Sequence, residues 1–224
     1  MKLAVVGAGA WGQVHAAKLA SRDDVELSAV VDRNLSKARS LAQDLGGCQA
    51  FQNIEELDAS VDAVVVAVDI GELYRASLQA LTRRLHVLVE KPMATSPREA
   101  LILERVAADQ DRVLAVGYLE RFNPNLDALR DIKDGIVAYR MGTGLPRCGP
   151  LLYDWTVHDL DLAGYLLGGD LHLSRFRRFR QGVSLQLSSS NGGKARIVTF
   201  EKARRAQRGI RSAYGQFVLG SDGV

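Results

Sequence analysis

The chain has 224 residues, 47% of them hydrophobic, and a formal net charge of +3 at pH 7. This size allows one large domain or two modest ones, and so small a charge does not call for a nucleic-acid partner. No apolar stretch reaches the roughly 18 residues of a membrane span, and Met1 and Lys2 lead straight into an apolar run without a signal-peptide pattern, so we expect a cytoplasmic protein with no membrane partner.

The first predicted strand, residues 3–6, leads into a glycine-rich turn, Gly7-Ala-Gly9-Ala-Trp-Gly12, and then into a helical pattern. Gly7 would make the tight turn, Gly9 would let the main chain approach a pyrophosphate, and Gly12 would let the helix pack closely on the strand. The free N–H groups at the amino end of that helix would hold the phosphates. Three glycines also fit an ordinary turn, but the strand and helix around them favour a dinucleotide site.

The second apolar run, residues 27–31, ends in Asp32, 20 residues beyond Gly12. At this distance an acidic side chain hydrogen-bonds the adenosine ribose and repels a 2′-phosphate, which predicts NAD as the cofactor. Arg33 beside it could pair with that phosphate, so NADP stays possible.

Apolar runs alternate with helical patterns through the first half of the chain. The predicted strands are residues 3–6, 27–31, 61–68, 87–89 and 113–116, and the predicted helices are residues 12–21, 36–45, 73–81 and 97–109. This order predicts an α/β fold with a doubly wound parallel sheet of the Rossmann type over residues 1–119.

The pattern changes after about residue 120, where helices are followed by a series of strands. The predicted helices are residues 125–133 and 157–167, and the predicted strands are residues 174–179, 183–188, 195–200 and 216–219. This order predicts a second, smaller α+β domain with a mostly antiparallel sheet over residues 120–224, for substrate binding and dimerisation. One face of that sheet should cover the domain's own helices with Phe176, Phe179, Val183, Leu185, Leu187, Ile197 and Val198.

Positive charge gathers in residues 175–180 and 202–208. Arginines among phenylalanines could bind single-stranded nucleic acid, but a strand with one packed face explains the first segment better, and we expect no nucleic-acid partner. A third interpretation is that some of these arginines meet an anionic substrate such as a sugar nucleotide. Cys48 and Cys148 are far apart and lack neighbours at metal-ligand spacing, so we predict neither a disulfide nor a metal site.

Three further motifs follow the glycine turn in order: Val87-Leu-Val-Glu90-Lys91-Pro92-Met93, then Gly117-Tyr-Leu-Glu-Arg121-Phe-Asn123-Pro124, then Asp154-Trp-Thr-Val-His158-Asp-Leu-Asp161. Together the four motifs resemble the Gfo/Idh/MocA family of nicotinamide-dependent oxidoreductases, and the last two look most like its UDP-N-acetylglucosamine 3-dehydrogenase subgroup. The resemblance implies a catalytic set of Lys91, Asp154 and His158, with a cis peptide before Pro92.

Hydride transfer to or from an alcohol carbon requires a group that exchanges the hydroxyl proton. His158 is the first choice, because its pKa is ordinarily near neutrality, and Lys91 would hold the same oxygen while Asp154 tunes both. Lysine as the base is the alternative. Arg121 and Asn123 either contact the substrate or form a turn that joins the domains. The predicted cofactor contacts are Gly7, Gly9, Ala10, Trp11, Gly12, Asp32, Arg33, Val68, Glu90 and Lys91.

The sequence departs from the family pattern at residues 69–74, where relatives commonly carry Pro and His, and we expect a trimmed second domain because the chain is short for the family. Two functions follow. One is an oxidoreductase acting on a hydroxyl or carbonyl of a sugar, cyclitol or nucleotide sugar. The other is a non-catalytic nucleotide-binding or regulatory protein. The uncovered face of the second sheet, with the interface that the resemblance implies there, predicts a homodimer or a tetramer.

Overall fold

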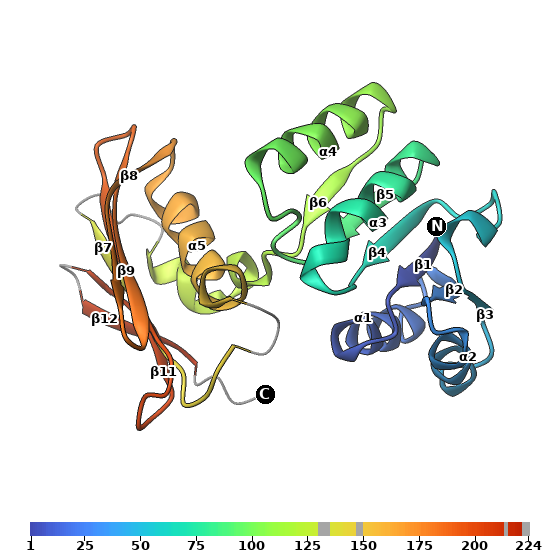
Figure 1. The fold of residues 1–224 in the computed structure, drawn as a ribbon, viewed down its shortest axis with the longest axis horizontal. Helices are drawn as coiled ribbons and strands as arrows, with labels where there is room; N and C mark the ends of the chain where they lie inside the picture. Colours follow the sequence, from blue (N-terminus) through green and yellow to red (C-terminus); the bar gives the residue numbers. More distant parts are fainter. Residues whose placement is uncertain (130–134, 147–149, 213–214, 221–224) are drawn as a thin grey trace. The chain divides into compact units, whose positions relative to one another are not determined.

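The computed structural model describes residues 1–129, 135–146, 150–212 and 215–220. The chain divides into two compact units, Met1–Gly117 and Tyr118–Val224 (Figure 1). No helix among these described residues combines the length and apolar character that crossing a membrane requires. Cys48 carries a free, half-buried thiol, and Cys148 lies outside the described residues.

The first unit is a parallel sheet with helices on both faces. Its strands are β1 (Lys2–Val6), β2 (Glu26–Val31), β3 (Gln49–Phe51), β4 (Ala63–Val66), β5 (His86–Val89) and β6 (Leu114–Val116), and its helices are α1 (Ala10–Ala20), α2 (Leu35–Asp44), α3 (Ile70–Thr82) and α4 (Pro97–Asp109), with a 3₁₀ turn at Ile54–Glu56. The strand order is β3-β2-β1-β4-β5-β6, and every neighbouring pair is parallel. This is the order of the Rossmann fold, so the predicted class of the first half is confirmed.

Both faces of the sheet are covered, which explains why its strands read as continuous apolar runs. Val5 and Val65 pack with Ala16 of α1, while Val6 and Val66 belong to the core that α3 and α4 close on the other side (Figure 1). Successive residues of a strand point to opposite faces, so a strand buried on both sides has no polar alternation.

Two helix starts in this unit depend on capping side chains. The Asn34 side chain accepts hydrogen bonds from the main-chain N–H groups of Ser36 and Lys37 at 3.1 and 3.4 Å, so α2 begins one residue before the predicted Ser36. Ser96 accepts from the N–H of Glu99 at 3.3 Å, with Pro97 in the first turn.

The second unit combines one six-stranded sheet with one long helix. Its elements are β7 (Ile136–Met141), β8 (Leu171–Phe179), β9 (Gly182–Ser189), β10 (Lys194–Phe200), β11 (Gln207–Ser212), β12 (Gly215–Gly220), α5 (Val157–Leu167), the π-helix Leu152–Thr156, and 3₁₀ helices at Leu119–Phe122 and Pro124–Leu129. The order is β12-β11-β7-β10-β9-β8, in which only β10 and β7 are parallel. The predicted mostly antiparallel sheet is confirmed. The predicted helix 125–133 is instead a 3₁₀ helix where it is described, and residues 130–134 lie outside the described part.

α5 packs on β10 and β7, in the middle of this sheet. Val183, Leu185, Leu187 and Ile197 join its core, as predicted. The prediction was wrong for three others: Phe176 and Phe179 are 47% and 39% exposed, and Val198 points to the face opposite Ile197. The physical reason is position, because β8 is the edge strand and lies beyond the two strands that α5 covers.

Candidate active site

The glycine turn leaves no room for side chains at two of its three glycines. Gly7 has φ of +107°, and a Cβ there would lie 2.3 Å from the carbonyl oxygen of Ala67. A Cβ on Gly12 would lie 1.7 Å from the carbonyl oxygen of Gly7. Both glycines therefore serve close backbone packing, and Gly12 brings α1 against the turn.

Gly9 is different, because a Cβ there would meet no protein atom within 4 Å. Gly9 is the N-cap residue of α1, it forms no side-chain cap, and the first turn of the helix has no acidic residue. The amino end of α1 therefore faces open space with its dipole available for an anion. These features fit the pyrophosphate of a dinucleotide.

Asp32 lies at the end of β2 beside this turn. Its Oδ2 accepts a hydrogen bond from the N–H of Ala8 and its Oδ1 accepts from the N–H of Asn34, both at 2.8 Å. The neighbouring Arg33 guanidinium lies 3.4 Å from the Asp69 carboxylate, and both side chains are largely exposed. The Asp69 carboxylate thus offsets the charge of Arg33, which makes this end of the site less favourable for an additional phosphate.

The remaining predicted cofactor residues in this region lie around the same turn. Ala10 and Trp11 are exposed at the start of α1, with Trp11 44% exposed. Val68 is half-buried, and its Cγ1 lies 3.2 Å from the position that a Cβ on Gly7 would take.

Glu90 and Lys91 follow β5 and are both buried. Glu90 Oε1 lies 2.7 Å from His15 Nε2, and Glu90 Oε2 accepts a hydrogen bond from the main-chain N–H of Lys91 at 3.3 Å. The Lys91–Pro92 peptide is cis, as the resemblance implies. His15 was not among the predicted site residues, although its spacing of four residues from Trp11 puts both on one side of α1.

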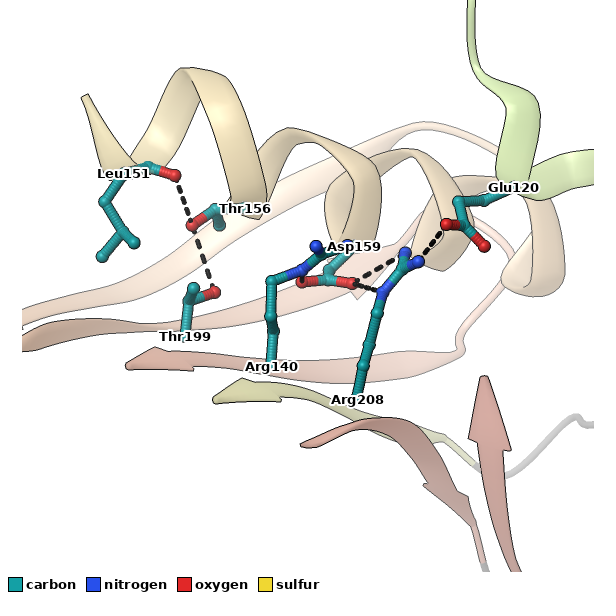
Figure 2. Close-up of polar contacts among 7 residues, drawn as sticks. All are labelled: Glu120, Arg140, Leu151, Thr156, Asp159, Thr199 and Arg208. Atoms are coloured by element: carbon teal, nitrogen blue, oxygen red, sulfur yellow. Dashed lines mark hydrogen bonds and ion pairs between the residues drawn. The ribbon is translucent and has the colours of Figure 1, made fainter. Parts of the chain in front are cut away.

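Asp154 and His158 lie on one continuous helical segment, because the π-helix Leu152–Thr156 leads directly into α5. Asp154 is buried and His158 is half-buried. The Thr156 hydroxyl donates to the carbonyl oxygen of Leu151 at 3.3 Å and lies 3.1 Å from the Thr199 hydroxyl of β10 (Figure 2). These contacts fix the segment to the sheet.

The turn that carries Asp154 also depends on the glycine that follows β7. Trp155 packs over Gly142, where a Cβ would lie 2.0 Å from the indole ring. π-helical turns are uncommon and concentrate at functional sites.

A buried ionic network anchors the next residue of α5. The Asp159 carboxylate is held between Arg140 of β7, at 3.6 Å, and Arg208 of β11, at 3.4 Å, and Arg208 also pairs with Glu120 (Figure 2). Burial raises the pKa of Asp159, and the two arginines act in the opposite direction. None of Glu120, Arg140, Asp159 or Arg208 was predicted as a site residue. Arg208, from one of the basic segments, therefore faces protein carboxylates.

Arg121 and Asn123 have partners within their own unit. The Arg121 Nε donates to both oxygens of Asp161 at 2.9 and 3.0 Å, and its guanidinium lies 5.5 Å from the Tyr118 ring and 5.7 Å from the Tyr165 ring. The hydrogen bonds with Asp161 raise the pKa of Arg121, so it stays charged. Asn123 accepts from the N–H of Asn125 at 3.0 Å. Their contact with a substrate stays a prediction.

The structure thus gathers the predicted cofactor residues at the carboxyl edge of the first sheet and places Asp154 and His158 together in the second unit.

A hollow of about 610 Å³ lies at the amino ends of β4 and β5, opposite the glycine turn. Its lining includes both acidic and basic side chains: Asp58, Asp62, Arg83, Arg84 and Arg112. Among the described residues, no group of three or more His, Cys, Asp or Glu side chains could hold a metal ion.

Comparison with known proteins gives consistent matches. Residues 1–118 match the sequence model of the Gfo/Idh/MocA family, described as an oxidoreductase family with an NAD-binding Rossmann fold. UDP-N-acetylglucosamine 3-dehydrogenase of Acidithiobacillus ferrooxidans is 32% identical over 176 residues, covering 76% of this chain and 55% of that protein. Inositol 2-dehydrogenase of Mycolicibacterium gilvum is 30% identical, covering 76% and 53%. The chain spans about half the length of these relatives.

Solved structures agree with this fold. The structure of the Acidithiobacillus ferrooxidans enzyme aligns with a TM-score of 0.83 and 28% identity, covering 94% of this chain and 73% of that one. A myo-inositol dehydrogenase from Lactobacillus casei, in complex with NAD(H) and myo-inositol, aligns with a TM-score of 0.84 and 19% identity, covering 100% and 75%. The second alignment supports the fold alone.

Proposed function

Because the chain belongs to the Gfo/Idh/MocA oxidoreductase family, with its NAD-binding Rossmann fold, we propose that it is an NAD-linked dehydrogenase acting on a hydroxyl or carbonyl group of a sugar, cyclitol or nucleotide sugar. The open space at Gly9, at the amino end of α1, is the main support for cofactor binding. Two relatives are named as dehydrogenases of UDP-N-acetylglucosamine and of inositol, and both compounds carry a ring with several hydroxyl groups.

We expect the protein to bind NAD more tightly than NADP. Asp32 is fixed by two main-chain N–H groups and would accept from the adenosine ribose hydroxyls. Arg33, the residue that could favour a 2′-phosphate, is already near Asp69, an exposed pair worth less than about 1 kcal/mol that still offsets its charge.

Bound NAD would accept or return a hydride at its nicotinamide ring. His158 would exchange the proton of the substrate hydroxyl. Asp154, one turn earlier, would orient the ring. Lys91 would donate from Nζ to the same substrate oxygen, and lysine as the base stays the alternative assignment.

A panel of ring alcohols tests this function, with NADH binding measured separately by fluorescence and turnover measured by absorbance of the reduced nicotinamide. UDP-N-acetylglucosamine and myo-inositol are the first substrates to try. Lys91→Ala and His158→Ala should each lower turnover roughly 100-fold or more while NADH affinity stays within a few-fold, because groups that exchange protons act mainly on the transition state.

The second candidate function is a nucleotide-binding or regulatory protein without turnover. Residues 69–74, which differ from the family pattern, favour it. NADH binding with no turnover on the whole panel, unchanged by either substitution, would support this function against the dehydrogenase.

We also propose that the chain forms a homodimer or a dimer of dimers through its second sheet. Leu173, Phe176 and Phe179 on the edge strand β8 are 58%, 47% and 39% exposed. Apolar side chains gathered on one strand are typical of an interface. The cytoplasmic location stays a prediction.

A further inference from the structure

Glu90 connects two parts of the first unit that the Rossmann topology does not bring together. His15 lies on α1, which follows β1, whereas Glu90 and Lys91 follow β5, and β4 stands between those strands in the sheet. The His15 imidazole and the Glu90 carboxylate nevertheless meet at 2.7 Å. This contact spans 75 residues of sequence.

We propose that His15 is a positioning residue for Lys91 and acts through Glu90. The proposal rests on the dehydrogenase function, in which Lys91 holds the substrate oxygen. Its structural basis is that both oxygens of one buried carboxylate have partners. Oε1 contacts His15, and Oε2 accepts the N–H of Lys91.

Burial restricts the orientation of the Glu90 carboxylate. The side chains of His15 and Glu90 are only 13% and 10% exposed. A buried carboxylate that loses a partner costs more than one ordinary hydrogen bond, so Glu90 has a strong preference for the orientation in which both contacts form. Gly117 flanks the same carboxylate, since a Cβ there would lie 3.5 Å from Oε2. With the carboxylate fixed, the peptide that begins Lys91 is fixed with it.

The contact therefore couples the cofactor helix to Lys91. The amino end of α1 is the predicted pyrophosphate site, and His15 lies on the same helix one turn beyond Trp11. Without the imidazole, Glu90 would turn toward water or another donor and release the Lys91 N–H. Lys91 would then sample more directions, and fewer of them would suit the transition state.

Three substitutions at His15 separate this role from a general effect on folding. His15→Gln keeps an amide nitrogen near the place of the imidazole Nε2, whereas His15→Asn is polar but one methylene shorter, and His15→Leu removes the donor. Lys18→Ala, at an exposed position in the last turn of α1, is the matched control. If His15→Leu fails to fold, the Gln and Asn pair still tests the contact.

Amide hydrogen exchange of the full chain, followed by NMR, gives a readout that does not need turnover. His15→Leu and His15→Asn should speed exchange at Lys91 about fivefold or more, while the N–H of Gly7, which donates to Val31 at 2.7 Å, should stay protected. Under saturating cofactor, kcat should fall about tenfold in both variants with NADH affinity within about threefold, and His15→Gln should restore both properties.

Each outcome decides one of the two proposals. Unchanged exchange at Lys91 in His15→Asn and His15→Leu would overturn the positioning role, and so would faster exchange with undiminished kcat. Equal losses in Lys18→Ala would also overturn it. If the wild-type chain binds NADH but turns over no substrate, the dehydrogenase proposal fails, while the exchange result still decides whether His15 controls Lys91 through Glu90.

Discussion

Replacing Gly9 and Gly12 separately by alanine should divide cofactor binding from folding. The two glycines are three residues apart in one turn, yet an added methyl group meets opposite surroundings. At Gly12 it would lie 1.7 Å from a main-chain oxygen, and at Gly9 it would meet nothing within 4 Å. At Gly9 the methyl group would therefore affect a bound ligand and not the packing of the protein.

The expected magnitudes follow from those distances. Gly12→Ala requires backbone atoms to move, because contacts below 3.0 Å are essentially never observed, and we expect a loss of about 3 kcal/mol in the free energy of unfolding. Gly9 has φ of −76°, which alanine adopts without strain. Alanine is a poorer N-cap than glycine but restricts the unfolded chain, and these opposing effects should leave stability within about 1 kcal/mol. The methyl group would occupy the approach to the pyrophosphate and weaken NADH binding about 100-fold, or roughly 2.8 kcal/mol.

Thermal unfolding followed by circular dichroism and NADH titration followed by fluorescence measure the two effects separately. Gly144→Ala serves as a control, because a Cβ there also meets open space but in the second unit. NADH binding to Gly9→Ala with wild-type affinity would refute a pyrophosphate site at this turn. Wild-type stability of Gly12→Ala would refute the close packing of α1 on the turn.

Three further predictions concern the cofactor, the buried network and assembly. Asp32→Ala should narrow the preference for NADH over NADPH, measured as a ratio of dissociation constants, and tighter wild-type binding of NADPH would contradict the assignment of NAD. Burial raises the pKa of Asp159 above its unfolded value of about 4. The folded state therefore holds this proton more tightly, and the protonated group stabilises the fold fully at pH values below the unfolded pKa. That stabilisation is lost as the pH rises through the folded pKa. Wild-type stability should therefore decline relative to Asp159→Asn as the pH rises from about 4 to 7 in urea titrations, and the opposite trend would mean that the arginines outweigh burial. Light scattering should give at least twice the chain mass of 24.4 kDa, and Phe176→Glu should shift the mass toward the monomer, whereas a monomer at all concentrations would rule out the interface.

The central strands of the first unit could be predicted from sequence because they are buried on both faces, whereas the short edge strand β3, Gln49–Phe51, is partly exposed and was not predicted. Apolar runs such as Ala63–Val66 are unambiguous when nothing polar interrupts them. The second unit was harder for a physical reason. β7 and β11 were not predicted, because each carries a buried arginine, Arg140 or Arg208, that breaks the apolar pattern and looks like a surface charge.

The candidate site also has features that the sequence predicts and features that it does not. The glycine turn and Asp32 were predictable, since local spacing defines them. The His15–Glu90 contact was not, because its two partners lie on elements that only the folded sheet brings together. Asp159 was hidden for a related reason: a carboxylate between two arginines reads in sequence as one more charge on an exposed helix face.

The parallel pairing of β7 with β10 has a consequence for biosynthesis. Ile136 pairs with Ala195, and the whole of α5 lies in the connection between them. When the chain is made from its amino end, α5 leaves the ribosome before β10, one of the two strands on which it packs, so part of its apolar side is exposed for that interval. The loop that closes when β7 meets β10 is long, and non-local closures of this kind slow folding. The helix that carries His158 therefore reaches its final place only after β10 has been made, and until then part of its apolar side is open to chaperones and proteases.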